Sequence, residues 1–569
     1  MIYTAFAIGM TVIVLIALGL ALYKNEKEST GSKLKRFWNF ISNLLDKYWW
    51  VCFIIIFAVF LFSRFYKLGF VPFGIHVDEL SIACDGKSLR DFGTDRYGIR
   101  HPFYLVNNGG GQNALYTYAM SIMLRFMPDT IFTLRSFAVF CGALCLFAMF
   151  GICYELSESK KWALIGPILV TILPVFVMSE RWALESYLLL PFSTYFMYFA
   201  IRAVKYEKQR DWIITGVLMG LSLYTYAVTF IMLPVMLVLI GVYLIIIKKF
   251  KWKQVLSLGI PLFIFAIPLI IFNLVNLGFI PEFSTSFCDF KRLPYAREQE
   301  LGLQNVVDNL VYFKDLFFGG EELTYNVFPE FGTIYAFLLV FMIIGLVYFV
   351  IDFARSFKEK RISVPGLFIC LNVGGLIFTM LLYAPNINRT NELFLPIAVY
   401  IFWGIYKSLH DRPLALTVTG VCGAASFAFF MYFYLFMSTD VYGLQVLFSN
   451  TGSMMGVDFA EEYYLQDGGK IYVMIEDEAH YKGEMMYYVG AEPGQHYVNE
   501  STGDDAWKDA QYGNVIIGFP AEFDENENAV YVIGDNWNHI TSYMISVGFN
   551  ADRRYPGYTI LYKELRPGK

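Results

Sequence analysis

The feature that most constrains this chain is a succession of apolar segments, each long enough to cross a lipid bilayer as a helix. About 20 apolar residues span the roughly 30 Å hydrocarbon core, and runs of this length recur up to about residue 437. Only 16% of the residues are charged, whereas soluble domains carry about 25%. Because backbone groups inside a bilayer must pair within their own segment, the sequence predicts a polytopic α-helical membrane protein.

The apolar segments predict about twelve transmembrane helices. The first segment has neither the basic start nor the small-residue cleavage site of a signal peptide, so we expect it to be retained. Residues 113–126 are too few, and too polar at one end, to cross the membrane, and they predict an interfacial helix. The predicted spans lie near residues 2–22, 48–65, 131–153, 162–178, 187–204, 212–228, 230–247, 254–277, 333–351, 364–382, 391–408 and 413–437.

Basic residues divide the predicted loops into two alternating sets. One set is short and rich in Lys and Arg, as in Lys160-Lys161 and the turn from Lys248 to Lys253. The positive-inside rule makes these turns cytoplasmic. The other set, which includes residues 67–112, residues 278–331 and everything after residue 437, is then extracytoplasmic. The sequence therefore predicts a multi-pass protein of a bacterial plasma membrane, with both termini outside.

The C-terminal residues differ in composition from the rest of the chain. Residues 438–569 carry a net charge of −13, and the remainder carries +8. Short β-branched or aromatic runs bounded by Gly, Asp and Asn predict strands, and residues 456–465 predict a short amphipathic helix. We expect a separate soluble α/β domain with a docking or lid role, because it has no catalytic motif. The predicted strands are 470–475, 514–519, 529–533 and 558–562.

These patterns predict three regions. Residues 1–48 would form an extra N-terminal transmembrane helix and a basic cytoplasmic loop. Residues 49–437 would form the main transmembrane domain, which carries the two long extracytoplasmic loops, and residues 438–569 the soluble domain.

Other motifs carry little chemistry. The eight cysteines have no zinc-binding spacing, although Cys84 and Cys288 lie in loops of the same predicted side, where a disulfide could join them. No basic stripe with interleaved aromatic residues lies outside short loops, so the sequence does not support a nucleic-acid partner.

Two adjacent carboxylates, Asp78 and Glu79, stand just beyond the second predicted span. Ionisable groups beside a membrane are costly, so they usually have a partner or a function. Neighbouring acids can also shift each other's pKa, which leaves one of them as a base. A solvated loop with two surface acids is the alternative.

Two arginines on the same predicted side are also candidates. Arg389 lies in a short polar turn, where its guanidinium could hold a lipid phosphate through two bonds or extend to the lipid headgroups. Arg181 and Glu185 are four residues apart, so in a helix they could form an ordinary surface pair.

The first long loop leaves a divalent-metal site open as an alternative. His76 and His101 share this loop with Asp78, Glu79 and Asp85. Carboxylate and imidazole groups are ordinary metal ligands, but their spacing here is not diagnostic of a metal motif. No other cofactor is indicated.

Several short stretches together resemble the GT-C glycosyltransferases, and in particular the branch of protein O-mannosyltransferases and lipid A aminoarabinose transferases (glycosyltransferase family 39-like). The resemblance covers roughly residues 49–440. An acid pair in the first large outer loop, directly after a membrane helix, is its most specific part. The other matching stretches are residues 72–77, 95–98, 110–116, 179–182, 223–226 and 388–391.

This resemblance implies a membrane enzyme that moves one sugar, with inversion, from a polyprenyl-phosphate donor to an acceptor at the outer face. The acceptor would be a glycan, a lipid or a protein. The family pattern makes Asp78 the general base, which agrees with the need of an attacking hydroxyl for a proton acceptor. Glu79 would orient the site, and Glu185 stands about where the family often has a second acid, usually Asp.

A leaving lipid phosphate needs cationic stabilisation more than it needs an acid. Arg389 is the first candidate for this role, and Arg292 and Lys291 are the second. The Lys-Pro-Pro run of the aminoarabinose branch is absent, which disfavours that branch's acceptor. The matching stretches also supply the expected substrate-binding residues: His76, Arg96, Tyr97, Gln112, Arg181 and Asn388.

Three other functions remain open at this point. A transporter or flippase for a lipid-linked sugar could also have twelve spans, but transporters tend to carry ionisable groups near the bilayer midplane, whereas here they gather at one face. An outer-face polysaccharide polymerase or ligase would depend on arginine rather than on an acid. A non-catalytic anchor for the C-terminal domain is the third.

Overall fold

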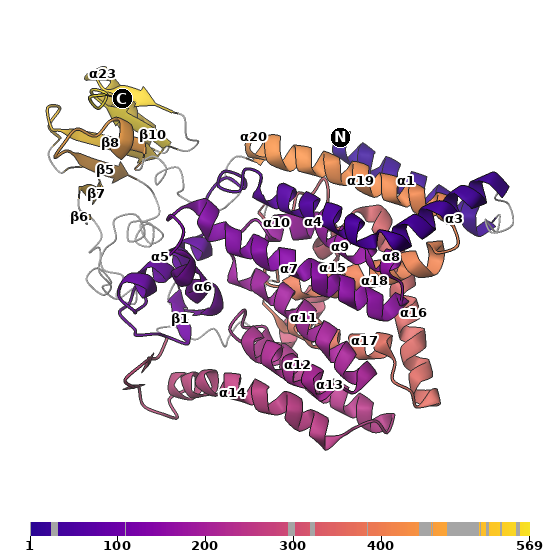
Figure 1. Ribbon diagram of the computed structural model, residues 1–569. Coiled ribbons are helices and arrows are strands. Elements are labelled where there is room, and N and C mark those ends of the chain that lie inside the picture. Colours follow the sequence, from indigo (N-terminus) through magenta and orange to yellow (C-terminus); the bar gives the residue numbers. More distant parts are fainter. Residues whose placement is uncertain are drawn as a thin grey trace.

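Most of the described residues up to Tyr442 are helical, and a six-stranded β-sheet lies near the C-terminus (Figure 1). The structure is a computed structural model. It describes residues 2–23, 32–107, 110–293, 302–318, 325–383, 385–442, 457, 459–474, 511–512, 514–518, 520, 523–534, 537–553 and 558–568.

Nine helices within these described ranges are long and apolar enough to cross a membrane, or ten if a pair bent by 77° counts as one span. The helices are α1 (Ile2–Tyr23), α3 (Ser32–Lys47), α4 (Trp49–Phe65), α5 (Val77–Asp91), α6 (Leu115–Met123), α7 (Ile131–Ser157), α8 (Lys160–Ala163), α9 (Ile165–Ile172), α10 (Pro174–Ser179), α11 (Glu185–Tyr206), α12 (Gln209–Ser222), α13 (Thr229–Ile246), α14 (Trp252–Asn276), α15 (Val306–Phe318), α16 (Ala336–Glu359), α17 (Val364–Leu381), α18 (Phe394–Leu409), α19 (Pro413–Phe436) and α20 (Ser438–Tyr442).

Every predicted span contains helix, but two of them are shorter than predicted. The segment 162–178 breaks before Pro174, where Leu173 adopts an extended conformation (ψ 133°). A proline disfavours the helical conformation in the residue before it. In the segment 212–228 the helix ends at Ser222, and the Tyr224 carbonyl accepts a hydrogen bond from the main chain of Leu115 (3.0 Å). The helix predicted at residues 113–126 is present as α6, and its interfacial position stays a prediction.

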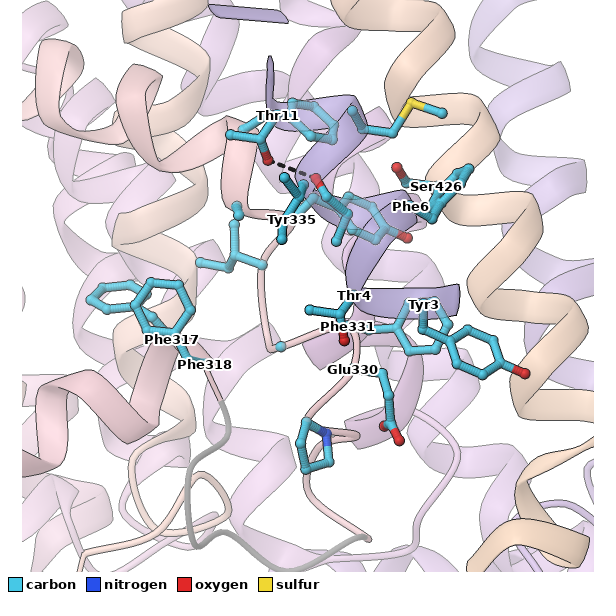
Figure 2. A pocket seen from close by; sticks show the side chains of 18 of the residues that line it. Tyr3, Thr4, Phe6, Thr11, Phe317, Phe318, Glu330, Phe331, Tyr335 and Ser426 are labelled. Carbon is cyan, nitrogen blue, oxygen red and sulfur yellow. Dashed lines mark hydrogen bonds between the residues drawn. The ribbon is translucent and has the colours of Figure 1, made fainter. Parts of the chain in front are cut away.

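The N-terminal helix α1 packs as part of the helical body, beside α19 (Figure 1). The ring of Tyr3 stacks on Phe429 with centroids 5.2 Å apart, and its hydroxyl donates to the sulfur of Met437 (3.4 Å). A cavity of about 350 Å³ lies between α1 and the segment 329–337, and it is lined mainly by aromatic and aliphatic side chains (Figure 2). None of the predicted site residues lines this cavity.

Helices α16 and α18 approach each other closely because glycines lie at their contact. An ideal Cβ on Gly345 would overlap the carbonyl oxygen of Tyr400, and one on Gly404 would overlap that of Phe341. Small residues allow this kind of backbone approach between membrane helices.

The C-terminal sheet has the strand order β6-β7-β5-β8-β10-β9, in which β5 runs parallel to β7 and β8 and the other pairs are antiparallel. All four predicted strands are confirmed, and the predicted helix at 456–465 is present at 459–463. Strands β6 and β9 and helix α23 were not predicted. The elements are β5 (Lys470–Met474), β6 (Gln511–Tyr512), β7 (Val515–Ile517), β8 (Ala529–Gly534), β9 (Asn550–Asp552), β10 (Tyr558–Tyr562) and α23 (Asn538–Ser546).

Two small hairpins, β1–β2 (Tyr104–Asn107 and Gly110–Asn113) and β3–β4 (Phe283–Ser284 and Asp289–Phe290), stand in the two long loops. An ion pair links these loops. Arg100 donates to the Asp289 carboxylate from its main-chain N–H (3.0 Å) and from its guanidinium (2.9 Å). These bonds lower the pKa of Asp289 to about 2. The eight cysteines, all in described positions, form no disulfide, so no Cys84–Cys288 bridge is present.

Gly404→Ala should destabilise the helical body, because the added Cβ meets the main chain of α16. Overpacking of this kind typically costs about 1–3 kcal/mol. Gly420→Ala is the matched control, since a Cβ there meets nothing within 4 Å. Melting temperatures in detergent should fall for the first variant and not for the second. An equal effect of both would show that the two helices do not pack this closely.

Candidate functional site

Both acids of the predicted pair, Asp78 and Glu79, lie in the first turn of α5, and their side chains point in different directions. Neighbouring residues of a helix do not face the same way. The side chain of Asp78 is 30% exposed, whereas that of Glu79 is fully buried. The two carboxylates therefore meet different surroundings.

Glu79 is held on all sides by the protein. Its two oxygens accept hydrogen bonds from the Arg135 guanidinium of α7, both at 2.9 Å. They also accept from the main-chain N–H of His76 (3.0 Å), which completes a capping box at the start of α5, and from that of Ala183 (2.7 Å). This carboxylate joins three segments of the chain, so it supports the site rather than facing a substrate.

Two further buried arginines join the loops to the helices. Arg64 donates to the Glu180 carboxylate at 2.6 Å. Arg181 is fully buried and donates to the main-chain carbonyls of Ser63 (2.8 Å) and Tyr66 (2.9 Å), near the end of α4. The alternative of an exposed Arg181–Glu185 pair is therefore wrong, and a direct contact of Arg181 with a substrate stays a prediction.

Asp78 is oriented by its neighbours but keeps an exposed surface. Its Oδ1 accepts a hydrogen bond from the Asn107 side-chain amide at 2.9 Å. Its own main-chain N–H donates to Nδ1 of His76 (3.1 Å). The imidazole lies beside the Tyr325 ring, with centroids 4.9 Å apart. The start of a helix also favours a negative charge.

Asn107 is a site residue that the sequence analysis missed. Its Oδ1 accepts hydrogen bonds from the Ser81 hydroxyl (2.8 Å) and from Arg96 (3.4 Å), so its amide NH₂ must point to Asp78. Asn-Gly between two short runs predicts a hairpin here, but this local signal does not place Asn107 beside Asp78.

Arg96 lies beneath this asparagine. It is buried, with Nε 3.5 Å from the Asp85 carboxylate, and it also donates to the Val106 carbonyl (3.1 Å). The half-buried Tyr97 ring lies 5.6 Å from its guanidinium. These contacts of Arg96 are with protein groups, and its contact with a substrate stays a prediction, as does that of Tyr97.

The pKa values of two buried acids near Arg96, Asp85 and Asp95, are raised. Burial, together with the nearby charge of Asp85, raises the pKa of Asp95 to about 8. Burial also raises the pKa of Asp85, against the opposing charge of Arg96. Asp95 accepts hydrogen bonds from the main-chain N–H groups of Tyr97 (3.0 Å) and Ile99 (2.9 Å). The Asp85–Asp95 pair therefore holds a proton more tightly than two exposed carboxyl groups would.

The start of α11 brings a second set of predicted residues to the site. Glu185, its first residue, accepts a hydrogen bond from the main chain of Asn113 at the end of β2. The next residue, Ser186, donates to the Asn388 side chain. Helix α11 therefore connects the first loop with the loop that carries Arg389.

The hydroxyl of Tyr226, in the turn after α12, lies within electrostatic reach of four charged side chains. Glu185 and Arg389 are two of them, and Asp78 and Glu392 are the others. The start of α5, the start of α11 and the loop 386–392 therefore contribute charged side chains to the electrostatic surroundings of one half-buried tyrosine, and we call this group the centre. The centre combines three carboxylates with one guanidinium.

The two cations predicted as second candidates for binding the donor phosphate, Lys291 and Arg292, have protein partners. Lys291 pairs with Glu282 (3.2 Å), and Arg292 donates to the Val275 carbonyl at the end of α14 (3.0 Å). Their role in binding a donor phosphate stays a prediction.

Gln112 is buried, and neither end of its amide has a partner in the described part of the chain. It shares a face of the β1–β2 hairpin with Asn107, since side chains alternate along strands.

The residues predicted as possible metal ligands, Asp78, Glu79 and His101, do not form a cluster. His101 stacks on Phe287 with centroids 4.7 Å apart, and its Nδ1 lies 2.9 Å from the carbonyl of the same residue. Among the described residues, no group of three or more His, Cys, Asp or Glu side chains could hold a metal ion. A metal site made by Asp78, Glu79 and His101 therefore has no geometric support.

Comparison with known proteins bears on this arrangement. Residues 113–275 match the family model described as dolichyl-phosphate-mannose-protein mannosyltransferase. The structure of ArnT from Cupriavidus metallidurans bound to undecaprenyl phosphate aligns with a TM-score of 0.54 and 9% identity, over 90% of this chain and 97% of that one. The predicted resemblance to the GT-C glycosyltransferases is confirmed.

The GT-C fold is supported by a second structure. ArnT from Cupriavidus metallidurans in the apo state aligns with a TM-score of 0.52 and 11% identity, over 90% of this chain and 97% of that one. No curated protein sequence matches this chain. The stretch matched by the family model contains Glu185 and Tyr226, while Asp78 and Arg389 lie outside it. At identities of 9% and 11% these structures show the fold alone. The chemistry must be argued from the residues of the site.

The two neighbouring acids should respond differently to substitution. Glu79→Gln removes one partner of a buried ion pair, which typically costs about 3–5 kcal/mol. Asp78→Asn changes a partly exposed group whose neighbour Asn107 can still donate to an amide oxygen. The melting temperature in detergent should fall clearly for the first variant and stay near that of the wild type for the second. A lower melting temperature for Asp78→Asn than for Glu79→Gln would contradict this assignment.

Raising the pH should weaken the folded state through Asp95. Its pKa of about 8 exceeds the ordinary 3.8, so between about pH 4 and pH 8 the folded chain keeps a proton that the unfolded chain releases. The free energy of unfolding therefore falls as the pH rises through this interval. Asp95→Asn removes the titration but keeps an oxygen acceptor. Its melting temperature should decline less with rising pH than that of the wild type, and parallel declines would refute the assignment.

Proposed function

We propose that this protein transfers a sugar from a polyprenyl-phosphate donor to an acceptor hydroxyl at the outer face of the membrane, with Asp78 as the general base. The observation that carries this proposal is the position of Asp78. It is the partly exposed acid of the pair, it is fixed by Asn107, and it shares the surroundings of Tyr226 with Arg389. The family model and the undecaprenyl phosphate bound by ArnT support a polyprenyl-phosphate donor.

The chemistry follows from these groups. The acceptor hydroxyl attacks the anomeric carbon of the donor sugar and gives its proton to the Asp78 carboxylate. The bond between that carbon and the phosphate oxygen breaks, and its electron pair leaves with the polyprenyl phosphate. The Arg389 guanidinium stabilises the charge that develops on the phosphate. Attack opposite the leaving group inverts the anomeric configuration.

The length and charge of α7 support the outer face. Its first turns carry Arg135, which holds Glu79 at the site, and Lys160 and Lys161 follow its other end. A helix of 27 residues is about 40 Å long. The site and this basic turn therefore lie at opposite ends of a membrane span, and basic turns face the cytoplasm. The C-terminal domain would then also lie outside, as a docking or lid domain.

The decisive test is sugar transfer by the purified full chain. Asp78→Asn should lower transfer from polyprenyl-phosphate sugars by about 100- to 10,000-fold, the usual contribution of a general base. Asp91→Asn is the matched control, because it removes an exposed acid at the other end of the same helix. Release of the polyprenyl phosphate carrier and formation of a glycosylated product are the measurements. Full transfer by Asp78→Asn would refute the proposed base.

Arg389→Ala should slow the same reaction by about 100- to 1,000-fold, as expected when one group that stabilises the transition state is lost. Arg355→Ala, which removes an exposed arginine near the far end of α16, is the control. If Arg389→Ala abolished transfer while Asp78→Asn did not, arginine-led ligase chemistry would replace the proposal. Movement of an intact lipid-linked sugar across the membrane, without cleavage, would favour a transporter.

A further inference from the structure

Glu392 is a buried carboxylate to which no other described residue donates a hydrogen bond. Glu392 is 4% exposed, and no other described residue donates a hydrogen bond to either of its side-chain oxygens. Other buried acids of the molecule differ in this respect. Glu79 binds Arg135, and Glu180 binds Arg64 and accepts a hydrogen bond from Tyr187 (3.1 Å).

An isolated buried carboxylate is costly. Removing an ionised group from water without a compensating partner costs several kcal/mol, and buried polar groups are normally hydrogen-bonded. Groups kept in such a state cluster at functional sites. The cost at Glu392 is therefore a reason to seek a ligand that supplies the missing donors.

The surroundings of Glu392 make room for this side chain. It belongs to the short 3₁₀ turn η3 (Asn391–Leu393), three residues after Arg389. Its Cγ lies against Gly375 of α17, where an ideal Cβ would approach to 2.9 Å. Any larger residue at this glycine would displace the carboxylate.

Glu392 also belongs to the centre already described. It lies within electrostatic reach of the Tyr226 hydroxyl, as do Asp78 and Glu185. Three carboxylates around one guanidinium do not suit a second anion beyond the single phosphate of the donor. They suit a ligand with several hydroxyl groups, because a carboxyl group accepts hydrogen bonds in either protonation state. A sugar offers several hydroxyl donors on adjacent carbons.

We propose that Glu392 is a specificity-determining residue that accepts hydrogen bonds from hydroxyl groups of the sugar bound beside Asp78. This inference rests on the proposed glycosyl transfer and names the contact that selects its sugar. The same chemistry could come from the donor sugar or from a sugar acceptor, and the binding measurements separate these sources. In either case the ligand supplies the hydrogen bonds that no other described residue makes to Glu392.

The first measurement is the melting temperature of the ligand-free protein. Glu392→Gln keeps the shape of the side chain and removes no hydrogen bond to another described residue, so the empty protein should melt at the same or a higher temperature than the wild type. Glu180→Gln is the matched control, a fully buried glutamate that has partners, and it should melt lower. A lower melting temperature for Glu392→Gln would mean that Glu392 stabilises the fold, which overturns the proposal.

The second measurement is ligand binding by the purified full chain. The probes are undecaprenyl phosphate, undecaprenyl phosphate carrying a single hexose, and a free methyl hexoside, each tested over a panel of hexoses. Undecaprenyl phosphate should bind wild type and Glu392→Gln equally. The affinity for the preferred sugar-bearing probe should fall about ten-fold or more in the variant, the usual effect of losing a hydrogen bond to a charged group.

The outcomes separate this inference from the proposed function. Weaker binding of the lipid-linked hexose assigns Glu392 to the donor, and weaker binding of the methyl hexoside assigns it to the acceptor. Unchanged affinity for both overturns the inference while transfer by the wild type still supports the proposed function. If the wild type neither binds nor transfers any of these sugars, the proposed function fails, and this inference fails with it.

Discussion

The site depends on one buried ion pair, between Glu79 at the start of α5 and Arg135 near the start of α7. Fully paired charges of this kind are tolerated in the interior only when every hydrogen bond is made, and Glu79 accepts four. The pair fixes the rotation of α5, because it holds one residue of the first turn inward. Asp78, the neighbouring residue, therefore does not face Arg135, and its side chain stays 30% exposed within the electrostatic surroundings of Tyr226.

The same principle separates the carboxylates of the centre into two kinds. Glu79 and Glu180 have strong protein partners and connect segments that are far apart in the sequence. Asp78 is held by one amide donor, and Glu392 accepts from no other described residue. Carboxylates of the first kind build the framework, and those of the second kind retain capacity for a ligand. Three buried arginines, Arg64, Arg135 and Arg181, donate hydrogen bonds to carboxylates and main-chain carbonyls of the protein.

Much of the fold could be predicted because membrane insertion leaves a coarse signal. Runs of apolar residues located all twelve predicted helical segments, and the resemblance to the GT-C superfamily was confirmed. The break before Pro174 and the early end of α12 were missed, because hydropathy does not register where a helix is interrupted. For the site, the acid pair was identified, but its two members could not be distinguished. Asn107 was missed because its importance comes from a contact across 29 residues.

The sequence by itself determined that this chain crosses the membrane many times, that it carries a C-terminal sheet, and that its unusual polar residues gather in one set of loops. These properties follow from composition and periodicity, which act locally along the chain. Only the tertiary structure decided which carboxylate is buried against an arginine, which one remains accessible, and that Glu392 lacks a partner among the described residues. The physical reason is that the environment of a charge is made by residues distant in the sequence, and folding alone brings them together.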